Sequence, residues 1–150
     1  GLLNVANVTG GSGDDLFVGN DLANTFTGGI GRDILIGRKG ADTLTGGEGD
    51  DLLLGGLTAF DLDSIKLETI RSEWTSAFTY LDRVAHLTGT SGGLNGTTFL
   101  GGISVPNGAT VFNDTNAKDS LIGGLGQDWF LTSLGDVLKD LETGETTISV

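Results

Sequence analysis

Along residues 10–56 a polar, glycine-rich block and a short apolar block recur with a fixed period of nine residues. Each unit has six residues rich in glycine and aspartate, followed by three that are apolar or β-branched. The last three favour a strand, and glycines at the first, second and fourth positions permit a tight turn with positive φ. Five units follow one another: GGSGDDLFV (10–18), GNDLANTFT (19–27), GGIGRDILI (28–36), GRKGADTLT (37–45) and GGEGDDLLL (46–54). The repeat therefore predicts short strands joined by six-residue turns.

Side chains alternate along each predicted strand, so the eighth position of a unit faces one way and the seventh and ninth face the other. The eighth positions predict an apolar interior: Phe17, Phe26, Leu35, Leu44 and Leu53. The outward positions of the odd units are apolar: Leu16, Val18, Ile34, Ile36, Leu52 and Leu54. Those of the even units are threonines 25, 27, 43 and 45. One outer face is thus apolar and needs a cover, either from the same chain or from another copy.

The glycine-free stretch 57–88 is the candidate cover. Its apolar residues recur at helical spacing: Leu62, Ile65, Ile70, Trp74, Phe78, Leu81 and Val84 or Ala85. Asp61 or Asp63 is the expected N-cap, residues 75–76 are an expected break between two helices, and Gly89 is an expected stop. We therefore expect a helical insertion over residues 57–95 that packs on a roll formed by residues 1–56. The alternative is that the apolar face is a subunit interface made by the six outward residues.

A degraded form of the repeat follows the predicted helices. The units VPNGATVFN (105–113), DTNAKDSLI (114–122) and GGLGQDWFL (123–131) predict further, degenerate coils within residues 96–131. Their sixth positions are Thr110, Asp119 and Asp128. Residues 132–150 are expected to close the open end of the sheet, which would otherwise invite edge pairing.

In phase over several units, the pattern G-G-x-G-x-D-x-U-x resembles the RTX (repeats-in-toxin) family of calcium-binding nonapeptide repeats. The final segment GDVLKDLETGETTISV is similar to the closing segment of that family. The resemblance implies a mainly β fold, a right-handed parallel β-roll with an α-helical insertion and C-terminal capping strands. It also implies that loops two units apart stack on one edge and bind calcium between them.

The resemblance implies ligand sets that combine backbone carbonyls with the aspartates at the sixth positions. One ion would take Gly11, Gly13, Asp15, Gly28, Ile30 and Asp33. A second would take Gly29, Gly31, Asp33, Gly46, Glu48 and Asp51. A weaker third site on the opposite edge would take Asn20, Leu22, Asn24, Gly37, Lys39 and Asp42. With Asp119 and Asp128 as further candidate ligands, about two to five calcium ions are expected.

Elementary chemistry favours calcium independently of that resemblance. Six or more oxygen ligands in a flexible arrangement suit calcium better than magnesium or zinc. Carboxylates stacked about 5 Å apart would repel one another by about 1 kcal/mol in water, and by more at a loop edge. We therefore expect folding to depend on calcium, because the ion removes this repulsion.

Composition restricts the partners. The formal net charge is -12, which disfavours binding to nucleic acid and to anionic membranes and favours cations. The chain has no cysteine, so disulfides and thiolate metal sites are excluded. No apolar run approaches the length of a membrane span, so we expect no membrane insertion. The RTX resemblance implies a secreted bacterial protein at an extracellular or cell-surface location.

The pattern favours a non-catalytic role. The stretch GTSGG at 89–93 fits a serine-hydrolase motif but lacks the strand before it and the helix after it. The sequence predicts a calcium-folded structural or adhesive module, with self-association into a filament or surface layer as an extension. The alternative is the C-terminal folding and secretion module of an enzyme. A minor alternative is ice binding through the threonine face.

Overall fold

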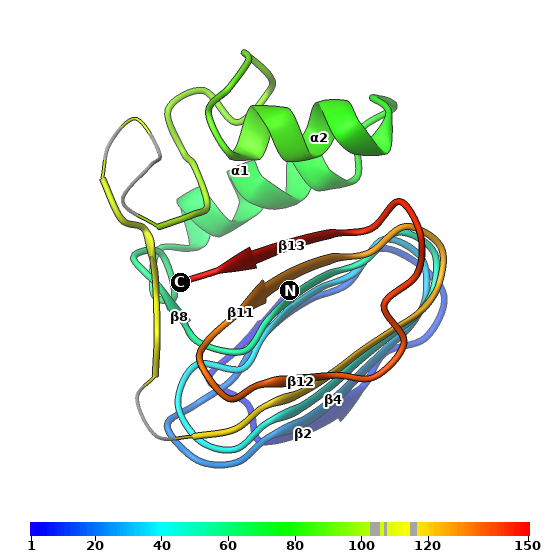
Figure 1. Cartoon of the computed structure of the whole chain (residues 1–150), viewed down its shortest axis with the longest axis vertical. Helices are drawn as coiled ribbons and strands as arrows, with labels where there is room; N and C mark the ends of the chain where they lie inside the picture. Colours follow the sequence, from blue (N-terminus) through cyan, green and yellow to red (C-terminus); the bar gives the residue numbers. More distant parts are fainter. Residues whose placement is uncertain (103–105, 107, 115–116) are drawn as a thin grey trace.

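Two parallel sheets face each other across an apolar interior, and two helices lie over one of them (Figure 1). The computed structural model describes residues 1–102, 106, 108–114 and 117–150. Sheet A contains, in order, β1 (Leu2–Leu3), β3 (Leu16–Val18), β5 (Ile34–Ile36), β7 (Leu52–Leu54), β11 (Trp129–Thr132) and β13 (Thr146–Ser149). Sheet B contains β12 (Val137–Leu138), β10 (Ser120–Leu125), β6 (Thr43–Glu48), β4 (Thr25–Ile30) and β2 (Asn7–Thr9). The expected parallel β-roll is confirmed.

Strand register follows the nine-residue period. Along the repeats each strand pairs with the strand 18 residues away, so that Phe17 lies beside Leu35 and Leu35 beside Leu53. The eighth-position side chains form one interior cluster and are at most 3% exposed. Leu121 and Phe130 extend this cluster into the later coils. The period-two alternation of a strand therefore places the interior as the sequence predicts.

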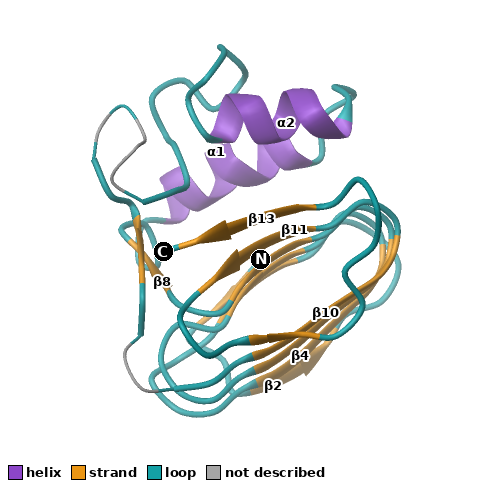
Figure 2. Cartoon of the chain, in the orientation of Figure 1, coloured by secondary structure: helices purple, strands orange, loops and turns teal. Residues whose placement is uncertain are grey.

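The helical pair covers sheet A (Figure 2). Helix α1 (Ser64–Trp74) begins after the N-cap Asp63, whose carboxylate accepts two backbone N–H groups, and α2 (Tyr80–Leu87) follows the expected break. Leu67, Ile70 and Trp74 are at most 1% exposed and cluster with the outward residues of β3, β5 and β7. The two helices thus lie within the segment expected to be helical and pack on sheet A.

The buried stripe of the helices differs in part from the expected one. Leu62, Ile65 and Leu81 are 80%, 77% and 68% exposed. Leu67 and Leu87 are buried instead. Several stripes in this segment fit a helical period, and docking on the sheet selects the one containing Leu67, Ile70 and Trp74.

The six outward residues proposed above as a subunit interface lie inside the single chain. Leu16, Val18, Ile34, Ile36, Leu52 and Leu54 are at most 4% exposed and belong to the cluster under the helices. The helices of the same chain therefore supply the cover that this face requires.

The predicted coil at 105–113 does not form in the described part of the chain. Residues 105 and 107 lie outside the described residues. Strand β9 (Val111–Phe112) pairs antiparallel with β8 (Leu57–Thr58) and belongs to neither sheet of the roll. Thr110 donates its hydroxyl to Phe99 O, so it bonds within the insertion. The chain re-enters sheet B only at β10, whose Ser120 pairs with Thr43.

The last strands continue the roll as its final coil. Strands β12 and β13 pair parallel with β10 and β11. The Asp140 carboxylate accepts the backbone N–H groups of Gly123 and Gly124, at 2.8 and 2.9 Å. A side chain therefore satisfies amides at the open end of the last loop.

Replacing an interior leucine tests the packing of the roll. Leu53→Ala removes a fully buried side chain and should lower the free energy of unfolding by about 2–5 kcal/mol. Leu62→Ala, at an 80% exposed position, should change it by less than about 0.5 kcal/mol. Urea denaturation in calcium measures both variants, and equal effects would contradict the assigned interior.

Candidate metal centre

Sixth-position side chains stack in a column along each edge of the roll. On one edge the backbone N–H of Asp15 donates to Asp33 Oδ1 at 2.7 Å, that of Asp33 to Asp51 Oδ1 at 2.8 Å, and that of Asp51 to Asp128 Oδ1 at 2.7 Å. On the other edge Asn24 N–H donates to Asp42 Oδ1 at 2.7 Å. Each aspartate therefore uses one carboxylate oxygen to bind the coil before it.

The second oxygen of these aspartates has no hydrogen-bond partner. It is buried in each of Asp33, Asp42, Asp51, Asp119 and Asp128, whose residues are at most 1% exposed. Buried oxygens of this kind are rare without a partner, because losing water without a replacement is unfavourable. Because the unpartnered oxygens recur with the same geometry, they indicate a common function, which is binding a cation.

Carbonyl oxygens of the adjacent coil converge on the same place. A Cβ atom on Gly28 would lie closer than 3.0 Å to Asp33 Oδ2 and 2.7 Å from Gly46 O. A Cβ atom on Gly46 would likewise lie closer than 3.0 Å to Asp51 Oδ2 and 2.6 Å from Gly123 O. A glycine at the first position is thus required for space, and the space is bordered by oxygens from two coils.

Backbone conformation also requires glycine at the fourth position of a unit. Gly31 has φ 138° and Gly49 has φ 122°, in the region that side chains disfavour. The second-position Gly29 and Gly47 also have positive φ, as the sequence predicts, but the first-position Gly28 is not among these residues. Close approach of the adjacent coil thus requires glycine at all three of these positions, and positive φ is a second requirement at the second and fourth.

Several of the proposed carbonyl ligands also join neighbouring loops. Gly11 O accepts Ile30 N–H at 2.8 Å, Ile30 O accepts Gly13 N–H at 2.6 Å, and Glu48 O accepts Gly31 N–H at 2.8 Å. A carbonyl oxygen has two lone pairs, so such a bond leaves one free for a cation. The structure brings these backbone groups and the Asp33 and Asp51 carboxylates to one edge, as the sequence predicts.

Burial raises the pKa values of the stacked aspartates. It raises the pKa of Asp33 to about 6, of Asp42 to about 7 and of Asp51 to about 8, and likewise the pKa of Asp119 to about 6 and of Asp128 to about 7. The backbone N–H bond that each carboxylate accepts opposes this rise in pKa, and neighbouring acids add to it. Without a cation, the ionised columns are therefore unfavourable near neutral pH.

The edge formed by residues 19–24 and 37–42 differs in its charges. Asn24 replaces an aspartate, and its Oδ1 accepts Asn20 N–H at 2.9 Å. The Lys39 side chain extends to Asp21 Oδ2 at 2.9 Å, and Arg38 pairs with Asp21 Oδ1 at 3.1 Å. Leu22 N–H donates to the Asn20 side chain. Side chains of the protein thus satisfy part of the hydrogen-bonding and charge requirements of this edge.

Helix residues contact the loops of the other edge directly. The fully buried Arg83 pairs with Asp50 Oδ2, and the indole N–H of Trp74 donates to Asp50 O at 2.9 Å. The Tyr80 hydroxyl donates to Asp128 O at 2.7 Å. Sequence reasoning missed the pair of Arg83 with Asp50, because a charged residue in a helix ordinarily indicates a solvated face and an aspartate in a turn ordinarily faces solvent.

No group of three or more His, Asp or Glu side chains in the described residues is arranged to hold a metal by side chains alone. A cation in the roll would therefore depend on backbone carbonyls together with the stacked carboxylates. One buried pair lies elsewhere: Glu73 Oε1 contacts His86 Nδ1 at 2.7 Å, and Glu73 Oε2 accepts Leu94 N–H. This pair ties the insertion together.

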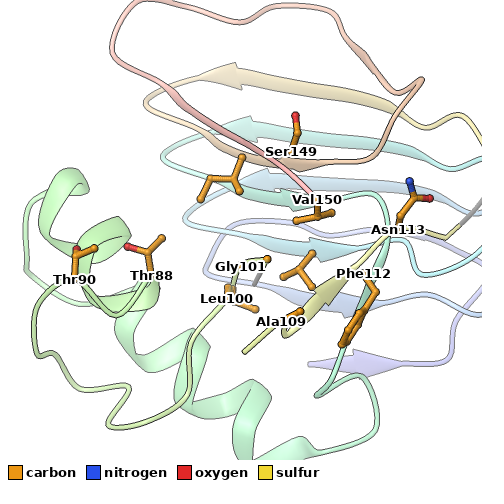
Figure 3. Close-up of a pocket in the computed structure, with 12 residues that line it drawn as sticks. Thr88, Thr90, Leu100, Gly101, Ala109, Phe112, Asn113, Ser149 and Val150 are labelled. Atoms are coloured by element: carbon orange, nitrogen blue, oxygen red, sulfur yellow. The ribbon is translucent and has the colours of Figure 1, made fainter. Parts of the chain in front are cut away.

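A cavity of about 670 Å³ lies between β13, β9 and the segment around Leu100 (Figure 3). Its described lining is mainly apolar and includes Val111, Phe112, Ile148 and Val150. None of the described lining residues carries a charged side chain. The cavity thus brings no general acid or base together from these residues.

Comparison with known proteins agrees with the geometry. The model of the RTX calcium-binding nonapeptide repeat matches residues 7–26 and 27–57. This part of the chain consists of RTX repeats, and such repeats bind calcium. Searches of curated proteins and of solved structures gave no match. Neither helix in the described residues is long and apolar enough to cross a membrane.

The raised pKa values predict how the metal-free roll responds to pH. A folded-state pKa of about 6–8 against an ordinary value of 3.8 means that the folded state holds more protons between these limits. The free energy of unfolding in chelator should therefore fall as pH rises from about 4 to about 8. Circular dichroism in chelator should show more folded protein at pH 5 than at pH 8.

A variant that lacks one titrating group, and the addition of calcium, provide two comparisons for this measurement. Asp51→Asn keeps the Oδ1 acceptor, removes one titrating group and should make the pH dependence shallower. Saturating calcium should reverse the trend, because the ion binds the deprotonated form. A folded fraction in chelator that rises with pH would contradict the assignment.

Proposed function

We propose that this chain is a calcium-folded structural module of a secreted protein. The observation that carries the proposal is the set of buried, unpartnered Oδ2 atoms repeated along both edges. Calcium accepts six to eight oxygen ligands in flexible geometry, and carboxylates and carbonyls are its usual donors in proteins. The donor set of the loops fits that chemistry, and the RTX repeats at residues 7–57 support it.

Two calcium sites are proposed on the edge of the roll where Asp15, Asp33 and Asp51 stack. The first uses Asp15 and Asp33 with carbonyls of Gly11, Gly13, Gly28 and Ile30. The second uses Asp33 and Asp51 with carbonyls of Gly29, Gly31, Gly46 and Glu48. Contacts that support both sets are the bonds from Asp15 N–H to Asp33 and from Asp33 N–H to Asp51.

A third set extends this edge past the insertion. Asp51 and Asp128 stack through a 2.7 Å hydrogen bond, and Gly123 O faces Asp51 Oδ2 beside Gly46. This arrangement repeats the relation of Asp33 and Asp51, although the two aspartates are 77 residues apart. We therefore include Asp128 as a ligand. On the opposite edge, the site at Asn24 and Asp42 should bind more weakly, because Lys39 and Arg38 already place positive charge there.

Calcium would stabilise the helices together with the roll. Asp50 lies next to Asp51 in the loop, and Arg83 and Trp74 bind its carboxylate and carbonyl. Breaking a buried ion pair leaves an uncompensated charge, so the helices favour the loop conformation that keeps Asp50 in place. Metal binding and helix docking would therefore reinforce each other.

The proposed role is non-catalytic, as a spacer or adhesive unit outside the cell. RTX repeats are typical of secreted bacterial proteins, and extracellular calcium would favour folding there. The apolar outer face of sheet A is covered by α1 and α2, so the candidate surfaces for joining copies are the edge strands, β1 and β13 in sheet A and β2 and β12 in sheet B. Size-exclusion chromatography of the chain in calcium tests this extension, and a larger species would support it.

Removal of calcium tests the proposal. The wild-type chain should lose its β-type circular dichroism spectrum on chelation near pH 7.5 and regain it with calcium, because the ionised columns repel without the ion. Asp33→Asn should raise the calcium concentration at the folding midpoint at least about tenfold, since Asp33 contributes to two ligand sets.

Asp63→Asn is the matched control. It removes the same charge but leaves a good N-cap on α1, so its midpoint should stay within about twofold of wild type. A wild-type spectrum that ignores chelator at this pH would exclude calcium-dependent folding.

A further inference from the structure

The insertion divides one loop of the roll into two pieces that the fold brings back together. In the undivided units a glycine faces the aspartate five residues later, as Gly37 faces Asp42 Oδ2. Gly55 faces Asp119 Oδ2 in the same way, although these residues are 64 apart. Gly55 therefore takes the first position of a unit whose sixth position is Asp119, and β8, α1, α2 and β9 lie between them.

This divided loop stacks on the loop formed by residues 37–42. Asp42 N–H donates to Asp119 Oδ1 at 2.7 Å, as Asp33 N–H donates to Asp51. A Cβ atom on Gly37 would lie 2.8 Å from Gly55 O and closer than 3.0 Å to Asp42 Oδ2. Asp42 and Asp119 are each 1% exposed, and the Oδ2 atom of each has no hydrogen-bond partner. Two buried, unpartnered oxygens thus border the junction of the two pieces.

Asp114 adds negative charge at the same junction from outside the repeat positions. It is 7% exposed, and neither carboxylate oxygen has a hydrogen-bond partner. Its charge acts on both Asp42 and Asp119. None of the ion pairs in the described part of the chain involves Asp42, Asp114 or Asp119. In the described residues, no ion pair therefore neutralises these three acids, and the nearby Arg38 and Lys39 pair with Asp21 instead.

We propose that a calcium ion binds at this divided loop, held by Asp42, Asp119 and the carbonyl of Gly55, with Asp114 strengthening its attraction from beside the site. The inference rests on the proposed function and goes beyond it, because this ion would join the two ends of the helical insertion. A site whose two loops both precede the insertion does not join the ends of the insertion. This site stabilises the closure of a 64-residue segment as well.

The closure has a physical consequence for the insertion. Bringing the ends of a long segment together has an entropic cost, and a cross-link at those ends removes part of that cost from folding. The stem of the insertion is short: β8 and β9 pair over two residues each, and Ala59 N–H donates to Thr110 O at 2.8 Å. Calcium at the divided loop would therefore protect this stem from opening.

The experiment combines ion counting with hydrogen exchange on the intact chain. Native mass spectrometry in saturating calcium should show one ion fewer for Asp119→Asn than for wild type. Amide exchange over residues 57–59 should be at least about tenfold faster in this variant, because the stem opens more often. Asn keeps the Oδ1 acceptor for Asp42 N–H, so the hydrogen bond itself remains available.

Asp15→Asn is the matched control on the opposite edge. It should also lose one ion, but the exchange of residues 57–59 should stay at the wild-type rate. An Asp119→Asn variant that keeps the wild-type ion count would overturn the inference, as would loss of an ion with no faster exchange. If wild type binds no calcium at all, the proposed function itself fails, and this result is distinct because neither variant then differs from wild type in ion count.

Asp114→Asn tests the inference should Asp119→Asn fail to fold. It leaves every repeat ligand in place and should weaken the affinity of one calcium ion about fivefold without changing the ion count at saturation. Calcium titration followed by exchange of residues 57–59 measures that affinity. An unchanged titration would show that Asp114 has no part in the site, and would overturn the inference in its stated form.

Discussion

Each coil of the roll buries a carboxylate against the next, and one oxygen of each remains without a proton donor. The rest of the architecture depends on how this charge is compensated. The first-position glycines exist because the carboxylate and a carbonyl of the adjacent coil occupy the place of a Cβ atom. The coils can approach this closely only when repulsion along the columns is offset, and under the proposed function a calcium ion offsets it.

The same constraint links the roll to its helices. Arg83, Trp74 and Tyr80 bind groups in the loops at Asp50 and Asp128, next to the columns. The helices also pack on the apolar outer face of sheet A through Leu67 and Ile70. A change in the loops therefore alters a polar anchor of the helices, whereas the apolar contact is indifferent to charge. The helical cover thus combines a polar attachment to the loops with an apolar attachment to the sheet.

The periodic part of the fold was predictable from the sequence, and the reason is local. A strand places alternate residues on opposite faces, so a nine-residue pattern fixes both the interior at Phe17 and Leu53 and the face at Leu52. The stacked aspartates follow from the same register. The family match ends at residue 57, where this regularity ends.

The remainder depends on contacts that no local pattern encodes. The unit at 105–113 resembles the repeat, yet Val111 pairs with Thr58 in an antiparallel ladder. Several helical stripes were compatible with the spacing of Leu62 and Ile65, and the sheet selected another. The pairing of Gly55 with Asp119 joins two fragments of a motif, which becomes visible only when the coils on both sides are in place.

The register across the insertion has a practical meaning. Asp42 meets Asp119 with the same geometry by which Asn24 meets Asp42, although 59 more residues intervene. The register of the stacked loops thus depends on where the intervening segment leaves and returns, whereas the apolar face of sheet A depends on the helices that this segment carries. A foreign domain with adjoining termini, inserted beside these helices rather than in their place, could therefore be displayed on a repetitive scaffold without changing its winding.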